Sequence, residues 1–228
     1  MCGRFTLHTA SDIIAQAFDV TLEHETAPRY NIAPSQPILG IRLDEMGRRV
    51  ATFFRWGLVP FWAKDASIGN KLINARAETV DEKPSFRASF RHHRCLVVAD
   101  GYYEWHTGPD GKQPYYITPA DPARPLMAFG GLFSTWHSPD GSELDTAALL
   151  TCAPNNALSF IHDRMPVIIE PDNWQTWLDP RTDRKALKPL LGPVADDRLT
   201  PVAVSKMVNT PRNDDARCIE PVADGTHG

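Results

Sequence analysis

Cysteine is scarce in this sequence, and its four residues lie far apart, at positions 2, 95, 152 and 218. No pair has the Cys-x-x-Cys spacing of zinc and redox sites, so we expect neither a bound metal nor a disulfide framework. Cys95 and Cys152 border apolar runs and are predicted to be buried core thiols. Cys2 fits neither class, because chain ends tend to fray and an exposed thiol there is open to oxidation.

Long apolar runs are also missing. None approaches the roughly 18 residues that a membrane-spanning helix needs. The first thirty residues lack the apolar stretch of a signal peptide, and their acidic residues argue against a transit peptide. We therefore expect a cytoplasmic protein with no membrane partner.

An excess of positive charge is absent, since 24 lysines and arginines face 28 aspartates and glutamates, a net charge of -4. This balance disfavours a protein that coats duplex DNA through bulk charge. It leaves room for a local basic groove, because proteins that bind single strands combine such grooves with aromatic stacking platforms.

Repeats and low-complexity segments are missing as well, while 20 prolines and 14 glycines are spread along the chain, as in a fold of many short elements. The patterns predict helices at 11–18, with Ser11 as a cap, and at 84–93, 154–161 and 171–178. Strands are predicted at 36–43, 49–59, 95–99, 102–106, 114–118, 126–133, 146–152 and 200–205, and Pro-Asp-Gly at 109–111 and 139–141 suits hairpin loops.

Strands dominate this pattern, and no stretch resembles a linker. We predict an α+β fold: a single domain, 1–228, with a strongly curved, mostly antiparallel, barrel-like β-sheet and peripheral helices. A monomer is the simplest expectation.

The segment Met-Cys-Gly-Arg-Phe at the start can carry chemistry. Methionine aminopeptidases remove Met1 when residue 2 is small, which would give Cys2 a free amine beside its thiol, with reference pKa values of roughly 8 and 8.5. Such an aminothiol forms a Schiff base with an aldehyde and then closes a thiazolidine ring. In an extended segment Arg4 would share a face with Cys2 and suit a phosphate. The alternative is a chance cysteine at an unprocessed end.

Two further segments present polar groups from predicted strands. In "LINARAET" (72–79), an extended run would place Asn74, Arg76 and Glu78 on one face, where amide and guanidinium suit a sugar with its phosphate. A structural Asn turn with an Arg–Glu surface pair is the alternative. In "DGYYEWH" (100–106), Tyr102 and Glu104 share a face, and burial among aromatic rings would raise the pKa of Glu104. An ordinary half-exposed carboxylate is the alternative there.

Two more segments complete the set. In "FIHDRMPVII" (160–169), His162 stands just before an apolar strand with Asp and Arg beside it, a placement that suits acid–base chemistry. A capping or core histidine is the alternative. In "RWGLVPFW" (55–62), Phe61 and Trp62 lie in a proline-rich loop and could stack on bases, although aromatic core packing would also explain them.

Taken in order, these motifs resemble one known family. "MCGRF", "RYNIAPSQ", "WGLVPFW", "NARAET", "DGYYEW", "HDRMPVI" and "VNTPRNDDARCIEPV" follow one another over nearly the whole chain. This pattern resembles the SOS-response-associated peptidase family. The resemblance implies recognition of abasic sites in single-stranded DNA and a reversible covalent thiazolidine crosslink through the N-terminal cysteine, which shields the lesion. It also implies a nucleoid-associated state when DNA is bound.

The resemblance also implies roles for individual residues and no cofactor. Cys2 would be the nucleophile, Asn74 would orient it, Glu104 would shuttle protons, and His162 would assist the Schiff-base chemistry and its reversal. Flanking phosphates and a base would be held by Arg4, Arg76, Arg164 and Trp62. "Peptidase" would refer to processing that exposes Cys2, and a DNA lyase activity through the Schiff base is chemically feasible.

Two rival functions remain open at this stage. Glutamine amidotransferases with an N-terminal nucleophile also begin Met-Cys-Gly, and there the thiol attacks an amide. No later motif of that class is present. The second rival is a non-covalent single-strand DNA binder in which Cys2 is incidental.

Overall fold

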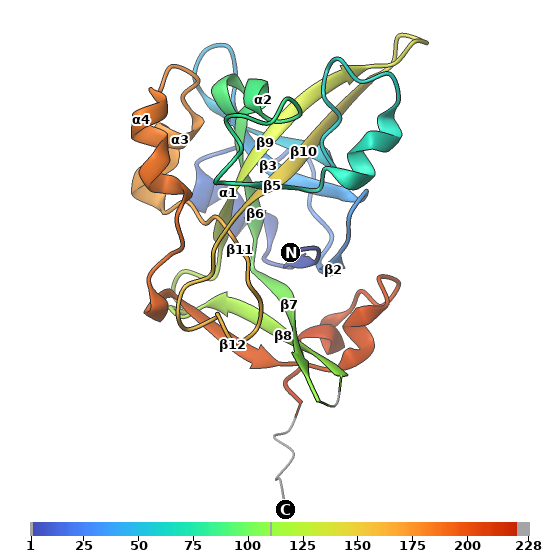
Figure 1. Cartoon of the computed structure of the whole chain (residues 1–228), viewed down its shortest axis with the longest axis vertical. Coiled ribbons are helices and arrows are strands. Elements are labelled where there is room, and N and C mark those ends of the chain that lie inside the picture. Colours follow the sequence, from blue (N-terminus) through green and yellow to red (C-terminus); the bar gives the residue numbers. More distant parts are fainter. Residues whose placement is uncertain (1, 110, 223–228) are drawn as a thin grey trace, which may run out of the picture.

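The computed structural model describes residues 2–109 and 111–222. Five strands close into a barrel, seen in the upper half of Figure 1: β3 (Pro37–Leu43), β4 (Arg49–Trp56), β10 (Glu143–Cys152), β9 (Met127–His137) and β6 (Arg94–Ala99). Each strand pairs with the next, and β6 returns to β3. Only β4 and β10 run parallel within this ring. Closure leaves the five strands with no open edge, and every residue of β6 is buried.

A second sheet lies below the barrel in Figure 1. Its order is β12 (Leu199–Ala203), β8 (Gly111–Pro119), β7 (Gly101–Gly108), β1 (Phe5–Leu7) and β2 (Arg29–Ile32). Along β7, Tyr102 packs into the main core, whereas Tyr103 and Trp105 belong to a smaller cluster with Val208 and Cys218. The predicted alternation of faces along this strand is therefore confirmed.

Short elements surround the two sheets. α1 (Ser11–Phe18) buries Ile14 and Phe18, and the Phe18 ring stacks on Trp174 with centroids 4.4 Å apart. The other helices are α2 (Arg87–His92), α3 (Trp174–Leu178) and α4 (Arg184–Leu187), with 3-10 turns η1 (Ala66–Lys71), η2 (Pro171–Asn173), η3 (Lys188–Leu191), η4 (Asp196–Arg198), η5 (Lys206–Asn209) and η6 (Ala216–Ile219). Two short strands, β5 (Asn74–Arg76) and β11 (Met165–Pro166), flank the end of β10.

The predicted fold class is confirmed: an α+β fold with a strongly curved, mostly antiparallel, barrel-like sheet and peripheral helices. Cys95 and Cys152 are buried, as expected. The turn at 139–141 closes the β9–β10 hairpin, with Gly141 at φ +86° and Asp140 accepting from Ser142 N–H. β7 and β8 pair down to Gly108 and Gly111, and position 110 of the other predicted loop lies outside the described residues.

Three local predictions are wrong. Ser11 does not cap α1, because Ala10 occupies that position and the Ser11 hydroxyl accepts instead from Thr26 N–H at 2.8 Å. The helix expected at 84–93 begins only at Arg87. Residues 154–161 form turns, since Asn155 Oδ1 accepts from Leu158 N–H and its amide nitrogen donates to the Val194 carbonyl. An asparagine that bonds to local backbone in this way offers the chain an alternative to a helix.

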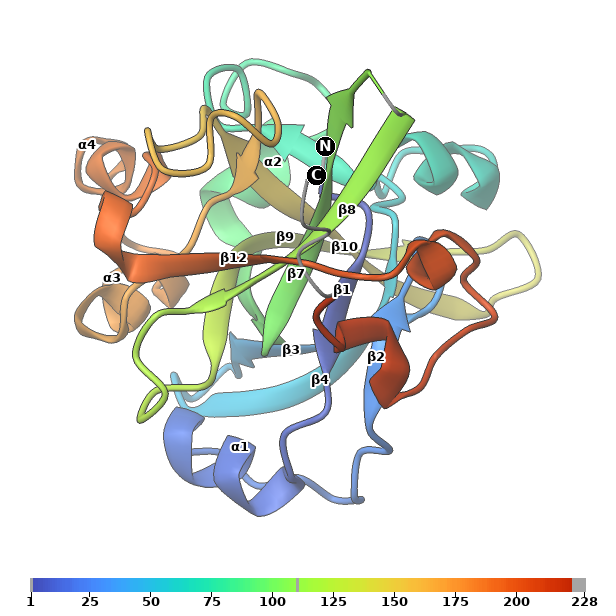
Figure 2. The ribbon, with the colours of Figure 1, turned by 90° about the horizontal axis from the view of Figure 1, so that it is seen from below.

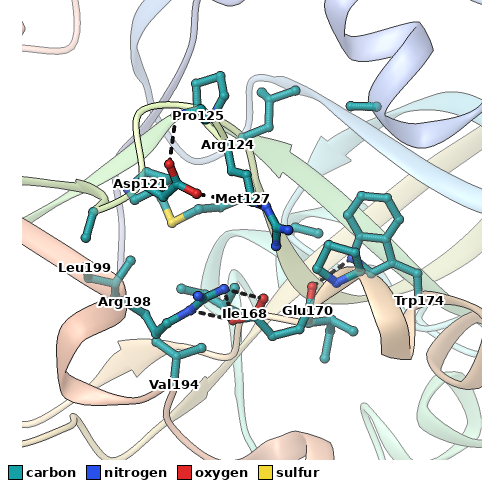
Figure 3. A pocket seen from close by; sticks show the side chains of 18 of the residues that line it. Asp121, Arg124, Pro125, Met127, Ile168, Glu170, Trp174, Val194, Arg198 and Leu199 are labelled. Atoms are coloured by element: carbon teal, nitrogen blue, oxygen red, sulfur yellow. Dashed lines mark hydrogen bonds and ion pairs between the residues drawn. The ribbon is translucent and has the colours of Figure 1, made fainter.

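A cavity of about 670 Å³ opens between α1, the β8–β9 connection and residues 168–174. Figure 3 shows Met127, Ile168 and Trp174 in its wall, with Arg198 paired to Glu170 at 2.9 Å. None of the site residues predicted from the sequence lines it. Within the described ranges, no helix is long and apolar enough to cross a bilayer, and no cluster of three or more His, Cys, Asp or Glu residues is arranged to hold a metal.

Candidate active site around Cys2

The segment that carries Cys2 enters the molecule between the barrel and the second sheet (Figure 1). Phe5 pairs with Tyr102 of β7, and Tyr103 N–H donates to the Arg4 carbonyl at 2.9 Å. Cys2, three residues before Phe5, lies close enough to Glu104 for the carboxyl to act on its thiol electrostatically. Cys2 is completely buried, and burial together with the Glu104 carboxyl raises the pKa of its thiol. The thiol is therefore protonated at neutral pH.

Asn74 fixes the backbone of Cys2. It begins β5, which lies parallel to β10 with Asn74 opposite Leu149. Its Nδ2 donates to the Cys2 carbonyl at 2.8 Å. Its Oδ1 is buried and has no hydrogen-bond partner among the described residues. A buried acceptor left in this state costs about 1–3 kcal/mol, so it points to a ligand rather than to stability.

Glu104 supplies a carboxyl at the same place. Its side chain is on the core face of β7, with 3% of the residue exposed. Burial raises the pKa of Glu104 to about 7, and the Asp163 carboxylate acts in the same direction. The sequence predicts this direction. A carboxyl with this pKa is present in both protonation states near neutral pH, which suits a group that both gives and takes a proton.

His162 and Arg164 come from the segment between β10 and β11. Burial lowers the pKa of His162, which keeps the ring neutral at pH 7. Its Nδ1 lies 3.0 Å from Arg164 N–H and 2.9 Å from Asp163 Oδ1. One nitrogen cannot serve both at once: unprotonated Nδ1 accepts from Arg164, and protonated Nδ1 donates to Asp163.

Arg164 joins this segment to β5. Its guanidinium forms a two-pronged pair with Glu78 at 2.6 and 2.9 Å, and it also donates to the Thr151 carbonyl at 2.5 Å. Thr151 lies opposite Arg76 in the β5–β10 pair, so Arg164 and the end of β5 meet at the same edge of β10. Arg76 is exposed there. Glu78 therefore pairs with Arg164, and not with Arg76 as the structural alternative had it.

Arg4 does not share a face with Cys2, so that prediction is wrong. Cys2 packs in the main core, whereas the Arg4 guanidinium donates to Asn31 Oδ1 and to the Val208 carbonyl, each at 2.8 Å. The prediction assumed an extended run from residue 2, but regular strand structure begins at Phe5. In this structure Arg4 joins the start of the chain to η5.

Trp62 and Phe61 lie on the loop between β4 and η1, where they are 50% and 67% exposed. The loop itself is fixed to the barrel: Val59 N–H donates to Thr146 Oγ1 at 2.8 Å, and Trp136 Nε1–H donates to the Ala63 carbonyl at 2.7 Å. By contrast, Trp56 is a buried core residue. The two exposed rings are thus held out on an anchored loop and are available to stack.

Asn74 contacts Cys2 directly and Glu104 acts on the Cys2 thiol. His162 and Arg164 lie on the neighbouring segment, whose Asp163 acts on Glu104. The sequence patterns alone missed three contributors. The Tyr102 hydroxyl is buried without a hydrogen-bond partner among the described residues, and it senses both Cys2 and Glu104 electrostatically. Asp163 raises the pKa of Glu104, and Lys112 lowers that of His162. The sequence pattern does place Tyr102 on the face of Glu104, but it gives Tyr102 no role.

Comparison with known proteins identifies the family. The family model described as "SOS response associated peptidase (SRAP)" matches residues 1–211. The abasic site processing protein YoqW of Bacillus subtilis is 44% identical over 225 residues, which cover 96% of this chain and 99% of that protein. The abasic site processing protein HMCES of Gallus gallus is 34% identical, over 86% of this chain and 66% of that protein.

Solved structures share the fold. A protein from Bacteroides thetaiotaomicron superposes with a TM-score of 0.88 at 24% identity, covering 97% of this chain and all of that one. A phage-related protein from Bordetella bronchiseptica gives a TM-score of 0.70 at 27% identity, over 90% of this chain and 95% of that one. With the family model matched over 1–211 and the relatives in agreement, this chain belongs to the SOS response associated peptidase family.

Proposed function

We propose that this protein recognises abasic sites in single-stranded DNA and joins them covalently through the aminothiol of Cys2, once Met1 has been removed. The names of the relatives support abasic-site recognition. One observation carries the covalent part of the proposal. Cys2 is buried beside the Glu104 carboxyl, whose pKa is about 7, and Asn74 holds the Cys2 carbonyl. An incidental cysteine at a fraying end would need neither complete burial nor a neighbouring carboxyl.

The chemistry balances without a cofactor or an oxidant. The Cys2 amine bonds to the aldehyde carbon of the ring-opened sugar, and the aldehyde oxygen leaves as water, which gives a Schiff base. The Cys2 sulfur then adds to the imine carbon, and the thiol proton ends on the nitrogen. The product is a five-membered thiazolidine. Because the thiol is protonated in its buried setting, the amine is the group that attacks first.

Glu104 and His162 move the protons that these steps require. Glu104, half protonated near pH 7, donates to the departing sugar oxygen and takes the proton that the amine releases. Neutral His162 accepts a proton during Schiff-base formation and returns it in the reverse reaction, with Asp163 Oδ1 2.9 Å from Nδ1 to stabilise the charged ring. Asn74 keeps Cys2 oriented, and its buried Oδ1 accepts from a hydroxyl of the opened sugar.

Cationic and aromatic side chains around this centre hold the strand. Arg76 and Arg164 lie at the same edge of β10 and bind flanking phosphates, Arg164 through the guanidinium that also holds Glu78. Trp62 stacks on a base from the exposed loop between β4 and η1. Arg4 secures the start of the chain through Asn31 and Val208, and its phosphate contact stays a proposal that rests on the family resemblance.

Two side activities follow from the same groups. Processing of the N-terminus, which exposes the amine, accounts for the peptidase in the family name. Strand cleavage from the Schiff base requires loss of a proton from the sugar before the thiol closes the ring. The buried thiol is on the same residue as the imine nitrogen, so ring closure competes effectively and cleavage is slow.

A denaturing gel tests the covalent function. The protein is mixed with a single-stranded oligonucleotide that carries one abasic site, and we expect a shifted band that resists denaturant. The band should vanish with Cys2→Ala and with an N-terminal tag that is not removed. A band that survives Cys2→Ala would defeat the thiazolidine mechanism.

Two control measurements separate the rivals. Cys2→Ala that still binds the oligonucleotide in a native gel shows that the lost band reflects lost chemistry rather than misfolding. Cys2-dependent release of ammonia from glutamine would instead favour the amidohydrolase.

A further inference from the structure

Phe160 is a large aromatic side chain that the mechanism above does not use. It lies two residues before His162, and 51% of it is exposed. Exposed phenylalanines are common one at a time, so exposure alone indicates nothing. What distinguishes Phe160 is its setting, because a prearranged set of side chains supports it.

Two residues of the β7–β8 hairpin hold Phe160. Its ring meets Tyr115 edge to face, with centroids 5.7 Å apart and an interplanar angle of 89°. Its carbonyl lies 2.6 Å from His106 Nδ1 and can only accept, so His106 carries its proton on Nδ1. The His106 ring packs against the Phe160 ring as well, at 6.1 Å. Phe160 is thus fixed through both its backbone and its ring.

The support continues the face of β7 that carries Glu104. His106 is two residues beyond Glu104 and therefore on the same face, about 7 Å along the strand. Tyr115 lies directly opposite Glu104 in β8. The aromatic group of His106, Tyr115 and Phe160 therefore forms one rim of the site, next to the carboxyl. Trp62 lies on a different element, the loop between β4 and η1 that is anchored to the barrel.

Positive charge accompanies this rim. Lys112, near the turn of the same hairpin, is close enough to lower the pKa of His162 electrostatically. A half-exposed ring with a cation beside it matches a nucleotide, whose base has a flat π-face and whose phosphate is anionic. Binding through such a ring is expected to be independent of base sequence, since every base can stack.

We propose that Phe160, backed by Tyr115 and His106, is a stacking platform for the nucleobase adjacent to the abasic residue. This inference rests on the proposed function, because that function supplies the strand. Trp62 and Phe160 then hold the strand from two rims, and the residue without a base falls between them, opposite Cys2 and Glu104. The gap left by the missing base becomes part of what the site recognises.

Binding to a chemically inert lesion tests the platform. Fluorescence anisotropy measures the affinity for single strands with a tetrahydrofuran abasic analogue, which has no aldehyde. We expect Phe160→Ala to weaken binding about fivefold to hundredfold and Phe160→Trp to restore it. The loss should shrink to less than about twofold when a second tetrahydrofuran replaces the adjacent nucleotide on one particular side. Phe53→Ala is the matched control, since Phe53 is 57% exposed on β4, and it should bind like the wild type.

The outcomes separate the two proposals. Equal affinities for Phe160→Ala and Phe53→Ala would overturn the platform. So would a loss that persists when either neighbouring base is missing, because Phe160 would then act by shaping its loop. If the wild type crosslinks a natural abasic site but Phe160 has no effect, only the platform fails. If Phe160 affects binding and no Cys2-dependent crosslink forms, the covalent function fails and the platform stands.

Discussion

Glu104 shows at the scale of one residue how the site trades stability for chemistry. Its pKa is raised from 4.5 to about 7 by burial. Between these two values the folded protein holds a proton that the unfolded chain releases, so the free energy of unfolding falls as pH rises through this window. The stability that the fold gains from holding this proton is fully present below pH 4.5 and is lost above about pH 7. The carboxyl therefore destabilises the fold at the pH where its proton is useful.

Replacing this carboxyl by an amide should reveal the trade. We expect Glu104→Gln to slow crosslinking while DNA binding remains. We also expect the variant to gain stability relative to the wild type between pH 4 and pH 8, by roughly 3 kcal/mol over the whole window. Urea denaturation of both proteins at the two pH values measures the gain, and crosslinking rates come from quenched time courses. A stability difference that is the same at both pH values would contradict the raised pKa.

Individual residues differ in how well sequence alone could predict them. The direction of the Glu104 pKa shift followed from its aromatic neighbours, because burial is written into the strand pattern. The contact of Asn74 with the Cys2 carbonyl could not be predicted, since it depends on the pairing of β5 with β10. The face on which the Arg4 side chain lies was also predicted wrongly. Residues 2–4 lie outside the regular strand, which begins at Phe5, so the alternation of faces does not extend back to Cys2.

At the scale of elements, the late motif "VNTPRNDDARCIEPV" holds the first strands in place. Asn31 of β2 is fully buried; its amide donates to the Asn213 carbonyl at 2.7 Å, and its Oδ1 accepts from Arg4. Asp214 accepts from the N–H groups of Tyr30 and Asn31 and pairs with Arg29. Figure 2 shows the red C-terminal turns lying against β2. The chain start is therefore held by residues nearly 200 positions away.

Removing the contacts of Asp214 with β2 should weaken the attachment of the start of the chain. We expect Asp214→Ala to lower the free energy of unfolding by about 1–3 kcal/mol, because it leaves backbone N–H groups of β2 without their acceptor. Crosslinking should slow as well, since β1 and Arg4 lose their support. Hydrogen exchange of β1 and β2 amides and crosslinking rates provide the measurements.

The matched control for Asp214→Ala is Glu143→Ala. It removes the acidic partner of His137 from an exposed pair on the β9–β10 hairpin. Such a pair contributes little to stability. Similar behaviour of the two variants would show that the late motif does not organise the active end of the chain.

Element prediction failed where side chains compete for backbone groups. Residues 154–161 carry a helical pattern of apolar positions, yet Asn155 bonds both to Leu158 within the segment and to Val194 outside it. The pattern of strands, by contrast, was predictable because β-branched and aromatic runs separated by Pro-Asp-Gly leave few alternatives. Ring closure through the β6–β3 pair joins strands that are far apart in sequence, and no local pattern indicates which strands meet.

At the scale of the whole molecule, the net charge of -4 limits how the protein can hold an anionic strand. Bulk attraction is excluded, so affinity has to come from a few placed cations and from stacking. The cations proposed to bind phosphates are Arg76 and Arg164 at the edge of β10 and Lys112 on the β7–β8 hairpin, and these three define the proposed path. Three phosphate contacts on a single strand predict a slope of about -2 for log affinity against log salt concentration.

A salt titration with the tetrahydrofuran oligonucleotide measures this slope, and single arginine variants show how much each arginine contributes to it. Arg76→Ala should make the slope shallower by about 0.7, the share of one phosphate. Arg181→Ala is the control, because Arg181 is 87% exposed and pairs with Asp179, outside the proposed path, and it should leave the slope unchanged. A wild-type slope steeper than about -5 would mean that many more phosphates are bound than this path can hold. A slope near zero would mean that stacking and the covalent step act without phosphate contacts, and the roles proposed for Arg76 and Arg164 would fall.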